Sequence, residues 1–348
     1  MAIEVRKARV EDAAAFARIA ESVRYQPQTA DATQGYLVFV GEPEEYAARL
    51  DGNESSYVGV EGGEVVSFLL ASQTAGNSAT RVVSDGAEAL LFGHSALLVD
   101  QIGVDPRHRG KGAGPAMYER LLAEVKPQRM TASIMHNPVK NLRSAGFFSG
   151  RFGWKCIGEY SEGIGFLWGI YEWKADGSQG NGRYPLGKFL YTLPVNETDL
   201  AARMERIRNL PTVLRNVLSR LNEDRLDLVP EPGAWTARQL VHHMADAHGQ
   251  LTARCRWILT EDKPAVKTFE ENLWAELSDA KTGPIEESLR MLEGLHWRIA
   301  TLIESRPHSD MQKELLHSEQ GLVKLDRVLA YLDWHGRHHT AQIAAIAS

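Results

Sequence analysis

The sequence is poor in cysteine and lacks any long uncharged apolar run. Its 348 residues include only two cysteines, Cys156 and Cys255, which lie in different halves of the chain. A framework of disulfides is therefore excluded, and a reducing compartment, the cytoplasm, is expected. Without an apolar stretch of about 20 residues, no transmembrane helix and no membrane partner are predicted. The first residues begin a strand-like pattern rather than a signal peptide.

Positively charged residues are also outnumbered. The chain has 39 lysines and arginines against 45 aspartates and glutamates, a formal net charge of -6, and neither half has a basic surplus. Binding to nucleic-acid phosphates needs a basic face, so no nucleic-acid partner is expected. A hydrophobic content of 43% and a charged content of 24% indicate an ordinary globular protein that can build full cores.

The length favours two domains, and the composition changes where the first would end. Residues 175–182 contain three glycines with serine, asparagine and aspartate, a composition typical of a linker. Before this segment, short strand-like runs alternate with helical stretches. Strands are expected at 3–8, 56–59, 65–71, 96–104, 130–134 and 166–173. This alternation predicts an α/β (α+β) domain over residues 1–175, followed by a linker over 176–183.

After the linker the strand-like runs cease. Apolar residues recur at three- and four-residue spacing in four long patterns, at 197–221, 236–260, 284–305 and 324–347. Four helices of this length predict an all-α four-helix bundle over residues 184–348, with a kink at Pro211. The connection over residues 262–282 is long and is expected to form a lid or a partner surface. The sequence leaves open whether the protein forms a homodimer.

The last predicted helix contains the sequence Trp-His-Gly-Arg-His-His at 334–339. On a helix, His335 and His339 project from one face, one turn apart, and two imidazoles placed in this way can hold a divalent transition metal. A third donor is expected from the second helix, where Thr236 is a suitable N-cap and a His-His pair follows. Two histidines at this spacing also occur by chance, so the second cluster is the observation that favours a metal site.

A glycine-rich motif lies between a predicted strand and a predicted helix in the first half. Residues 110–114 include three glycines in five positions. Glycines allow successive backbone N–H groups to converge on an anion, and the helix N-terminus adds a favourable dipole. Arg107, Arg109 and Lys111 add positive charge. A solvated turn is the alternative, but the combination favours a pyrophosphate ligand.

The second half resembles the DinB/YfiT-like family, in its bacillithiol S-transferase branch. The residues that carry the resemblance are 184–189, Trp235, Thr236, His243, Ala245, Asp246 and 334–339. The resemblance implies a metal held by His243, His335 and His339, with His242 and His338 as neighbours. Three imidazoles favour zinc or nickel over magnesium or calcium. Close relatives tend to have a histidine where this chain has Gln342, a position that is not a ligand in the family.

The first half resembles the GNAT acyltransferases. Their pyrophosphate loop, Gln/Arg-x-x-Gly-x-Gly/Ala, matches at Arg107, Gly110 and Gly112, and an asparagine of their closing motif matches at Asn141. The resemblance implies acetyl-CoA as the cofactor. The residues expected to contact it are Gln101, Ile102, Gly103, Val104, Arg107, Arg109, Gly110, Lys111, Gly112, Ala113, Gly114 and Asn141.

One departure from the GNAT pattern concerns proton transfer. Seven residues after that asparagine, the family often has a tyrosine that protonates the leaving thiolate, whereas this chain has Phe148. Phenylalanine cannot donate a proton, so either Tyr160 or a water molecule replaces it, or the domain is slow or silent. Asp100 and Glu88 are the candidate general bases.

Together the resemblances imply a bifunctional detoxification enzyme. One half would acetylate a small amine with acetyl-CoA, and the other would use a metal to transfer a low-molecular-weight thiol to an electrophile. Two alternatives stay open. In the first, the bundle binds metal without catalysis beside an active acetyltransferase. In the second, the bundle is a metal-dependent hydrolase and the GNAT half only senses acyl-CoA.

Overall fold

In this computed structural model, the residues described are 3–73, 87, 90–91, 96–161, 165–177, 184–191 and 196–347. The chain divides into two compact units. The N-terminal unit comprises Met1–Tyr160 with Leu167–Asn181, and the C-terminal unit comprises Ser161–Phe166 with Gly182–Ser348. In the part of the chain that the structure describes, none of the helices has both the length and the apolar character that a membrane crossing requires.

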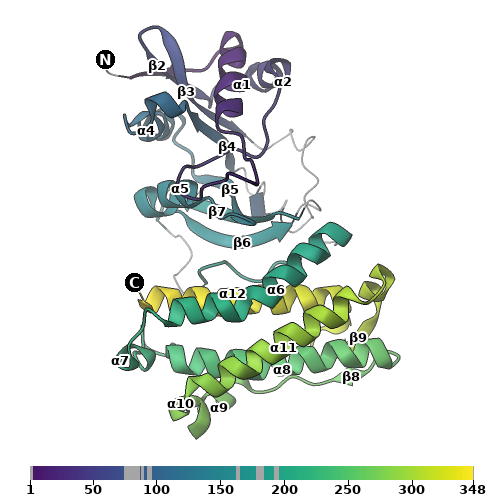
Figure 1. The fold of residues 1–348 in the computed structure, drawn as a ribbon. Helices are drawn as coiled ribbons and strands as arrows, with labels where there is room; N and C mark the ends of the chain where they lie inside the picture. The colour runs from purple at the N-terminus through teal and green to yellow at the C-terminus, as the bar shows by residue number, and fades with distance from the viewer. Residues whose placement is uncertain are drawn as a thin grey trace. The chain divides into compact units, whose positions relative to one another are not determined.

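A seven-stranded sheet forms the centre of the N-terminal unit, in the order β1-β2-β3-β4-β5-β7-β6 (Figure 1). Its strands are β1 (Glu4–Lys7), β2 (Tyr57–Glu61), β3 (Glu64–Gln73), β4 (Leu97–Val104), β5 (Arg129–Asn137), β6 (Lys155–Ser161) and β7 (Leu167–Lys174). The six expected strands are confirmed within a few residues. Strand β6 was not expected, because its sequence Lys-Cys-Ile-Gly-Glu-Tyr-Ser lacks an apolar alternation of period two.

Alternate residues of the strands face two separate apolar cores. Phe68 and Leu70 of β3 pack with α1 and α2, whereas Leu69 and Ala71 pack with Met117 of α4. Figure 1 shows α1 and α2 together and α4 apart from them. The helices of this unit are α1 (Ala13–Ser22), α2 (Pro43–Leu50), α4 (Ala113–Val125) and α5 (Leu142–Ala145), followed by a π-helical segment at Gly146–Arg151.

Strands β4 and β5 are parallel and pair only near their first residues. Leu97 pairs with Met130 and Leu98 pairs with Thr131, and no further pair joins the described residues of these two strands. Strand β4 also has a bulge at Asp100, the residue between two that pair with consecutive positions of β3. Because the strands separate, a small cavity of about 60 Å³ is lined by residues from both of them.

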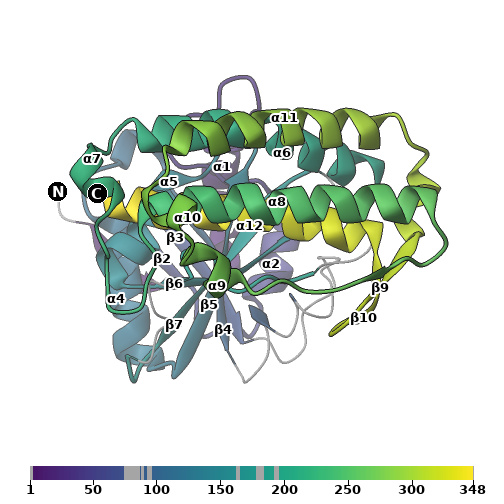
Figure 2. The same cartoon turned by 90° about the horizontal axis from the view of Figure 1, so that it is seen from below.

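Four long helices form the C-terminal unit and run side by side (Figure 2). They are α6 (Glu197–Leu218), α8 (Ala237–Thr260), α11 (Ile285–Glu304) and α12 (Leu325–Ala347). Helices α6 and α8 each pack against both α11 and α12. All four were expected, and Thr236 caps α8 by accepting a hydrogen bond from the backbone N–H of Gln239. Helix α6 continues through Pro211 to Leu218.

The connections between these helices contain short elements that the sequence did not predict. They are α7 (Glu223–Leu226), α9 (Glu271–Ala275), α10 (Ser278–Thr282), β8 (Ala265–Val266), β9 (Glu314–His317) and β10 (Gly321–Lys324). The three strands form a small sheet in the order β10-β9-β8. These three strands were missed, because strands of two to four residues are too short to give a periodic signal, whereas the expected four-helix bundle is present.

Two apolar clusters fill the interior of the bundle, and a polar layer separates them. One cluster includes residues 251–258 of α8 and 325–332 of α12, and the other includes residues 240–245 and 343–346 of the same helices. Between these segments lie His248 of α8 and His335 of α12, and at the same level of α11 lies His296. All three histidines are buried. The middle of this bundle is therefore built from imidazoles rather than from aliphatic side chains.

Candidate metal centre and candidate cofactor site

The three expected metal ligands lie together inside the C-terminal unit. His243 is on α8, and His335 and His339 are on α12, one turn apart. The Nε2 atom of His335 is 3.1 Å from Nε2 of His243 and 3.2 Å from Nε2 of His339. Potential ligand atoms of all three residues lie within 4.8 Å of one another. His242 and His338 do not belong to this group.

The imidazoles of the cluster are neutral at neutral pH. Burial lowers the pKa of His243 to about 3 and that of His339 to about 4, and it holds the pKa of His335 well below its usual range. A neutral imidazole has one N–H group and one nitrogen lone pair. The Nδ1 atom of His339 lies 2.7 Å from Oε1 of Gln342, an amide oxygen that accepts a hydrogen bond from the N–H group of the ring. The Nε2 atom of His339 therefore faces the other two rings with its lone pair, the form in which histidine binds a metal.

The cluster opens on a cavity of about 470 Å³, which lies within the C-terminal unit. All three histidines line this cavity, together with Trp235 and Glu271. Three neutral imidazoles whose Nε2 atoms meet at 3.1 to 3.2 Å around His335 form a donor set that fits a divalent transition metal. A cavity beside three protein ligands leaves room for a further ligand, as catalytic metal sites require.

Several residues near the cluster were missed by sequence reasoning. Glu271 and Tyr331 line the cavity, and burial raises the pKa of Glu271. Glu271 lies on α9, in the long connection after α8, where no periodic pattern placed it. His248 bonds to His335, and His296 bonds to His248. The sequence did contain an indication that His296 is buried, because it lies at an apolar position of α11 between Leu292 and Ile299.

The glycine-rich loop of the N-terminal unit leads into α4, as expected. Gly110 and Gly112 have φ angles of 80° and 83°, in the left-handed region that favours glycine. Gly112 is the N-cap of α4, and a Cβ atom added at either glycine would meet no atom within 4 Å. A cavity of about 430 Å³ borders the loop. The expected residues that line it are Ile102, Val104, Arg109, Gly110, Gly112, Ala113 and Gly114.

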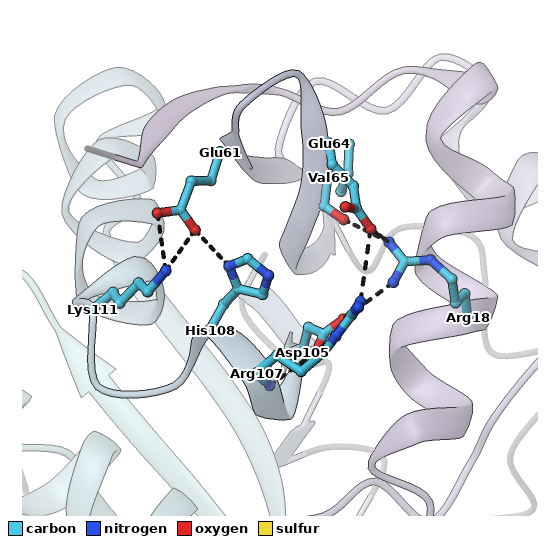
Figure 3. A network of polar contacts seen from close by, with 8 residues as sticks. All are labelled: Arg18, Glu61, Glu64, Val65, Asp105, Arg107, His108 and Lys111. Atoms are coloured by element: carbon cyan, nitrogen blue, oxygen red, sulfur yellow. Dashed lines mark hydrogen bonds and ion pairs between the residues drawn. The ribbon is translucent and has the colours of Figure 1, made fainter. Parts of the chain in front are cut away.

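Two of the loop's basic side chains bind carboxylates instead of lining this cavity (Figure 3). Arg107 pairs with Asp105 at 2.7 Å, and Lys111 pairs with Glu61 at 2.8 Å. Glu61 also contacts Nδ1 of His108 at 2.5 Å. The structure therefore does not bring the side chains of Arg107 and Lys111 to the place expected for a pyrophosphate.

Other arginines supply the positive charge of the cavity. Arg109 lines it and donates a hydrogen bond to Oε1 of Gln34 at 3.0 Å. Arg143 and Arg151 line it as well, from the segment after β5. Burial lowers the pKa of Arg109, and the nearby charge of Arg143 lowers it further. Arg143 and Arg151 were missed because they are distant from the glycine-rich motif in sequence.

Comparison with known proteins assigns both units. The DinB superfamily model matches residues 206–343. Over 165 residues the chain is 43% identical to a Geobacillus thermodenitrificans protein named as a candidate metal-dependent hydrolase, a match that covers 47% of this chain and 93% of the relative. The chain belongs to the DinB superfamily. The model of the acetyltransferase (GNAT) family matches residues 24–154, so this protein joins a GNAT domain to a DinB domain.

Each half of the chain is also similar to further known proteins. A Bacillus cereus protein with the same kind of name is 40% identical over 164 residues, which cover 47% of this chain and 94% of the relative. The structure of YfiT from Bacillus subtilis is 28% identical, with a TM-score of 0.46 over 47% of this chain and 94% of that chain. An N-acetyltransferase from Staphylococcus aureus is 18% identical, with a TM-score of 0.34 over 50% of this chain and 99% of that chain.

The other expected cofactor contacts of the GNAT domain lie beside the separated strands. Gln101 and Asn141 line the small cavity between β4 and β5. The side chain of Gln101 donates to the carbonyl oxygen of Phe39 at 2.7 Å. The side chain of Asn141 donates to the carbonyl oxygen of Tyr36 at 3.0 Å and caps α5. Gly103 lines neither cavity. The polar atoms of Gln101 and Asn141 therefore form hydrogen bonds to the backbone of Phe39 and Tyr36, which borders the cavities.

The expected acid and bases of the GNAT domain have different surroundings. Asp100 lines the small cavity and forms an ion pair with Arg49. The hydroxyl group of Tyr160 lies 3.0 Å from Oγ of Ser133 in the protein interior, and Tyr160 lines neither cavity. Phe148 lines both cavities. Glu88 lies outside the described residues.

Proposed function

We propose that the DinB domain binds one divalent transition metal, zinc or nickel, through the Nε2 atoms of His243, His335 and His339. The observation that carries this proposal is the convergence of three neutral imidazoles at 3.1 to 3.2 Å beside a cavity. When bound, such a metal lowers the pKa of a thiol or water ligand and so supplies a nucleophile at neutral pH.

The reaction that we propose for this site is transfer of a low-molecular-weight thiol to an electrophile. Trp235 and Tyr331 offer apolar surface to the substrate in the cavity. Burial raises the pKa of Glu271 on the cavity wall, which favours its protonated form as a proton donor. Hydrolysis, with water as the nucleophile, is the second candidate, and the names of the sequence relatives favour it.

Metal analysis of the purified protein tests the first step. We expect about one transition metal per chain in the wild-type protein and loss of that metal in His335→Ala and His339→Ala. His242→Ala is the matched control, because His242 is on α8 but bonds to Ser288 and Gly283 outside the cluster. Wild-type protein without stoichiometric metal, or His243→Ala with unchanged metal content, contradicts the ligand assignment.

An assay of the metal-loaded protein separates the two reactions. Thiol conjugation to an electrophile is expected, and it should disappear in His335→Ala. Release of a hydrolysis product without consumption of thiol would favour the hydrolase instead. A metal-loaded protein with neither activity would leave the bundle as a non-catalytic metal-binding domain.

We propose that the GNAT domain binds acetyl-CoA and acetylates a small amine. The pyrophosphate would bind to backbone N–H groups of residues 109–114 at the start of α4, close to Arg109 and Arg143. The pantetheine arm would follow residues 101–104 of β4, where β4 and β5 separate. The amine would attack the thioester carbonyl directly and displace the thiolate of CoA.

Calorimetry with acetyl-CoA tests this binding site. Gly112→Glu places a carboxylate at the open N-cap of α4 and should weaken binding strongly, because it repels and obstructs the phosphates. Gly52→Glu is the matched control, because Gly52 also has a positive φ angle and open space around it but lies outside the cavity. Equal affinity of Gly112→Glu and wild type for acetyl-CoA would exclude the glycine-rich loop as the binding site. Binding without acetylation of any amine would favour an acyl-CoA sensor.

A further inference from the structure

A chain of buried hydrogen bonds runs from the candidate metal centre across the bundle. Nδ1 of His335 is 3.0 Å from Nε2 of His248, and Nδ1 of His248 is 2.7 Å from Nε2 of His296. Nδ1 of His296 is 2.5 Å from the backbone carbonyl oxygen of Ile207 on α6. The exposed fractions of His248 and His296 are 0% and 1%, so water does not reach this chain.

The carbonyl oxygen of Ile207 is available because of a proline. In an α-helix this oxygen accepts the N–H of the residue four positions later, which here is Pro211. Proline has no N–H group, so α6 leaves the oxygen of Ile207 without its helical donor. Nδ1 of His296, from α11, donates to it instead.

This anchor decides the direction of every hydrogen bond in the chain. A carbonyl oxygen can only accept, so Nδ1 of His296 carries a proton and its Nε2 accepts from Nδ1 of His248. Nε2 of His248 then accepts from Nδ1 of His335. The reverse direction would need a hydrogen-bond donor at the carbonyl group of Ile207, which has none. A protonated His296 ring, which could donate from both nitrogens, is disfavoured because burial lowers the pKa of His296 to about 4.

We propose that His248 and His296 are positioning residues that hold His335 as the Nδ1–H tautomer, with its Nε2 lone pair directed at His243 and His339. The proposal rests on the proposed metal site but not on the reaction performed there. Partners behind a metal-binding histidine fix its tautomer and ring orientation, and their loss commonly costs 10- to 100-fold in metal affinity. Here the partner is a chain of two further histidines that ends on a helix carbonyl.

Nuclear magnetic resonance of the metal-free protein tests the tautomer directly. In ¹⁵N-labelled wild-type protein at neutral pH, we expect His335, His248 and His296 each to show a protonated Nδ1 and an unprotonated Nε2. The same measurement on His296→Leu should show that His335 no longer occupies a single tautomer. A protonated Nε2 on His335 in the wild-type protein, or an unchanged spectrum of His335 in His296→Leu, overturns the proposal.

Metal affinity provides the second test. His248→Leu removes the acceptor of His335 but keeps an apolar side chain in the interior, so affinity for zinc should fall 10- to 100-fold. In His248→Gln the amide oxygen can replace the acceptor, and much of the affinity should return. His242→Leu, on the same helix but outside the chain, should bind zinc as the wild type does.

The outcomes of these tests separate the two proposals. If the wild-type protein binds no zinc, the proposed metal site is wrong. The tautomer of His335 in the metal-free protein still tests whether His248 and His296 position its ring. If zinc binds and His248→Leu, folded by circular dichroism, keeps wild-type affinity, the chain is only structural. A loss of the same size in His242→Leu would also overturn the positioning role, because the effect would then not be specific to His248.

Discussion

Gly336 lets α12 approach α6 and α8 beside the histidine cluster. A Cβ atom at this position would lie 2.2 Å from Cδ2 of Leu210 and 3.0 Å from Cε1 of His248. Leu210 and His248 are both buried, so neither can move without disturbing its neighbours. The absence of a side chain at Gly336 is therefore a condition for the packing of His248 next to His335.

We predict that Gly336→Ala destabilises the bundle. Overpacking of a close contact costs roughly 1–3 kcal/mol. Gly294→Ala is the matched control, because Gly294 lies on α11 with no atom within 4 Å of an added Cβ, and both changes gain about 1 kcal/mol of helix propensity. Urea unfolding followed by circular dichroism should rank Gly294→Ala above wild type and Gly336→Ala roughly 1–3 kcal/mol below Gly294→Ala. Equal stability of the two variants would refute the close contact.

The buried histidines should make the metal-free protein sensitive to acid. Burial lowers the pKa of His296 to about 4, whereas an unfolded histidine titrates near 6.5. The neutral form is favoured by folding, so its contribution is complete above about pH 6.5 and is lost progressively as the pH falls from about 6.5 to about 4. Between pH 7.5 and pH 5, this single group costs about 2 kcal/mol of unfolding free energy.

Urea unfolding with a chelator present, at both pH values, measures this effect. His296→Leu should remove that share of the pH dependence, and the control His242→Leu should keep the wild-type pH dependence. A wild-type slope in His296→Leu would show that folding does not lower the pKa of His296.

At the scale of secondary structure, the start of α8 determines where His243 lies. Thr236 Oγ1 accepts from the N–H of Gln239 at 3.2 Å, and Oε1 of Gln239 accepts from the N–H of Thr236 at 3.1 Å. Such a reciprocal cap fixes the first turn of a helix. His243 follows two turns later and points into the cluster.

Removal of this cap should weaken the bundle. Thr236→Ala is expected to lower the free energy of unfolding by about 1 kcal/mol, because the N–H of Gln239 loses its acceptor. Thr236→Ser keeps the hydroxyl oxygen and should stay close to wild type. Chemical denaturation of the three proteins compares them, and equal losses in Ala and Ser variants would point to the lost methyl group rather than the cap.

In helix α6, Pro211 has an effect on the local backbone that the sequence predicts and an effect on a distant side chain that it does not. Proline inside a helical pattern predicts a kink, and Pro211 lies inside α6, which runs from Glu197 to Leu218. What Pro211 changes is the carbonyl oxygen of Ile207, which accepts from His296. No sequence pattern joins His296 to Ile207, because they are on different helices and 89 positions apart.

At the scale of the whole molecule, a DinB domain with a cluster of three histidines and a GNAT domain occur in one chain. In thiol-based detoxification, a conjugate is trimmed to an S-substituted cysteine whose amine is then acetylated. We predict that the GNAT domain prefers S-substituted cysteines over polyamines, protein N-termini and aminoglycosides as acetyl acceptors. A screen of amines with acetyl-CoA measures this preference. Acetylation of aminoglycosides or peptides, with none of S-substituted cysteines, would rule out the coupled route.

The sequence alone determined the two fold classes and most elements. Apolar repeats of period 3.6 located all four long helices, because each buries one face along its whole length. Strand β6 was missed because its apolar residues do not alternate with period two, and β8 to β10 were missed because they are short. The spacing of His335 and His339 suggested a shared face, since a helix brings residues four apart together.

Only the tertiary structure decided what surrounds these residues. His248, His296 and Glu271 reach the centre from separate helices, and Arg143 replaces Arg107 beside the glycine-rich loop. Helix periodicity is a local property of the backbone, so it can be read from neighbouring positions. Contacts between helices and the pairing of charges depend on how distant segments pack, and single positions in the sequence do not encode them.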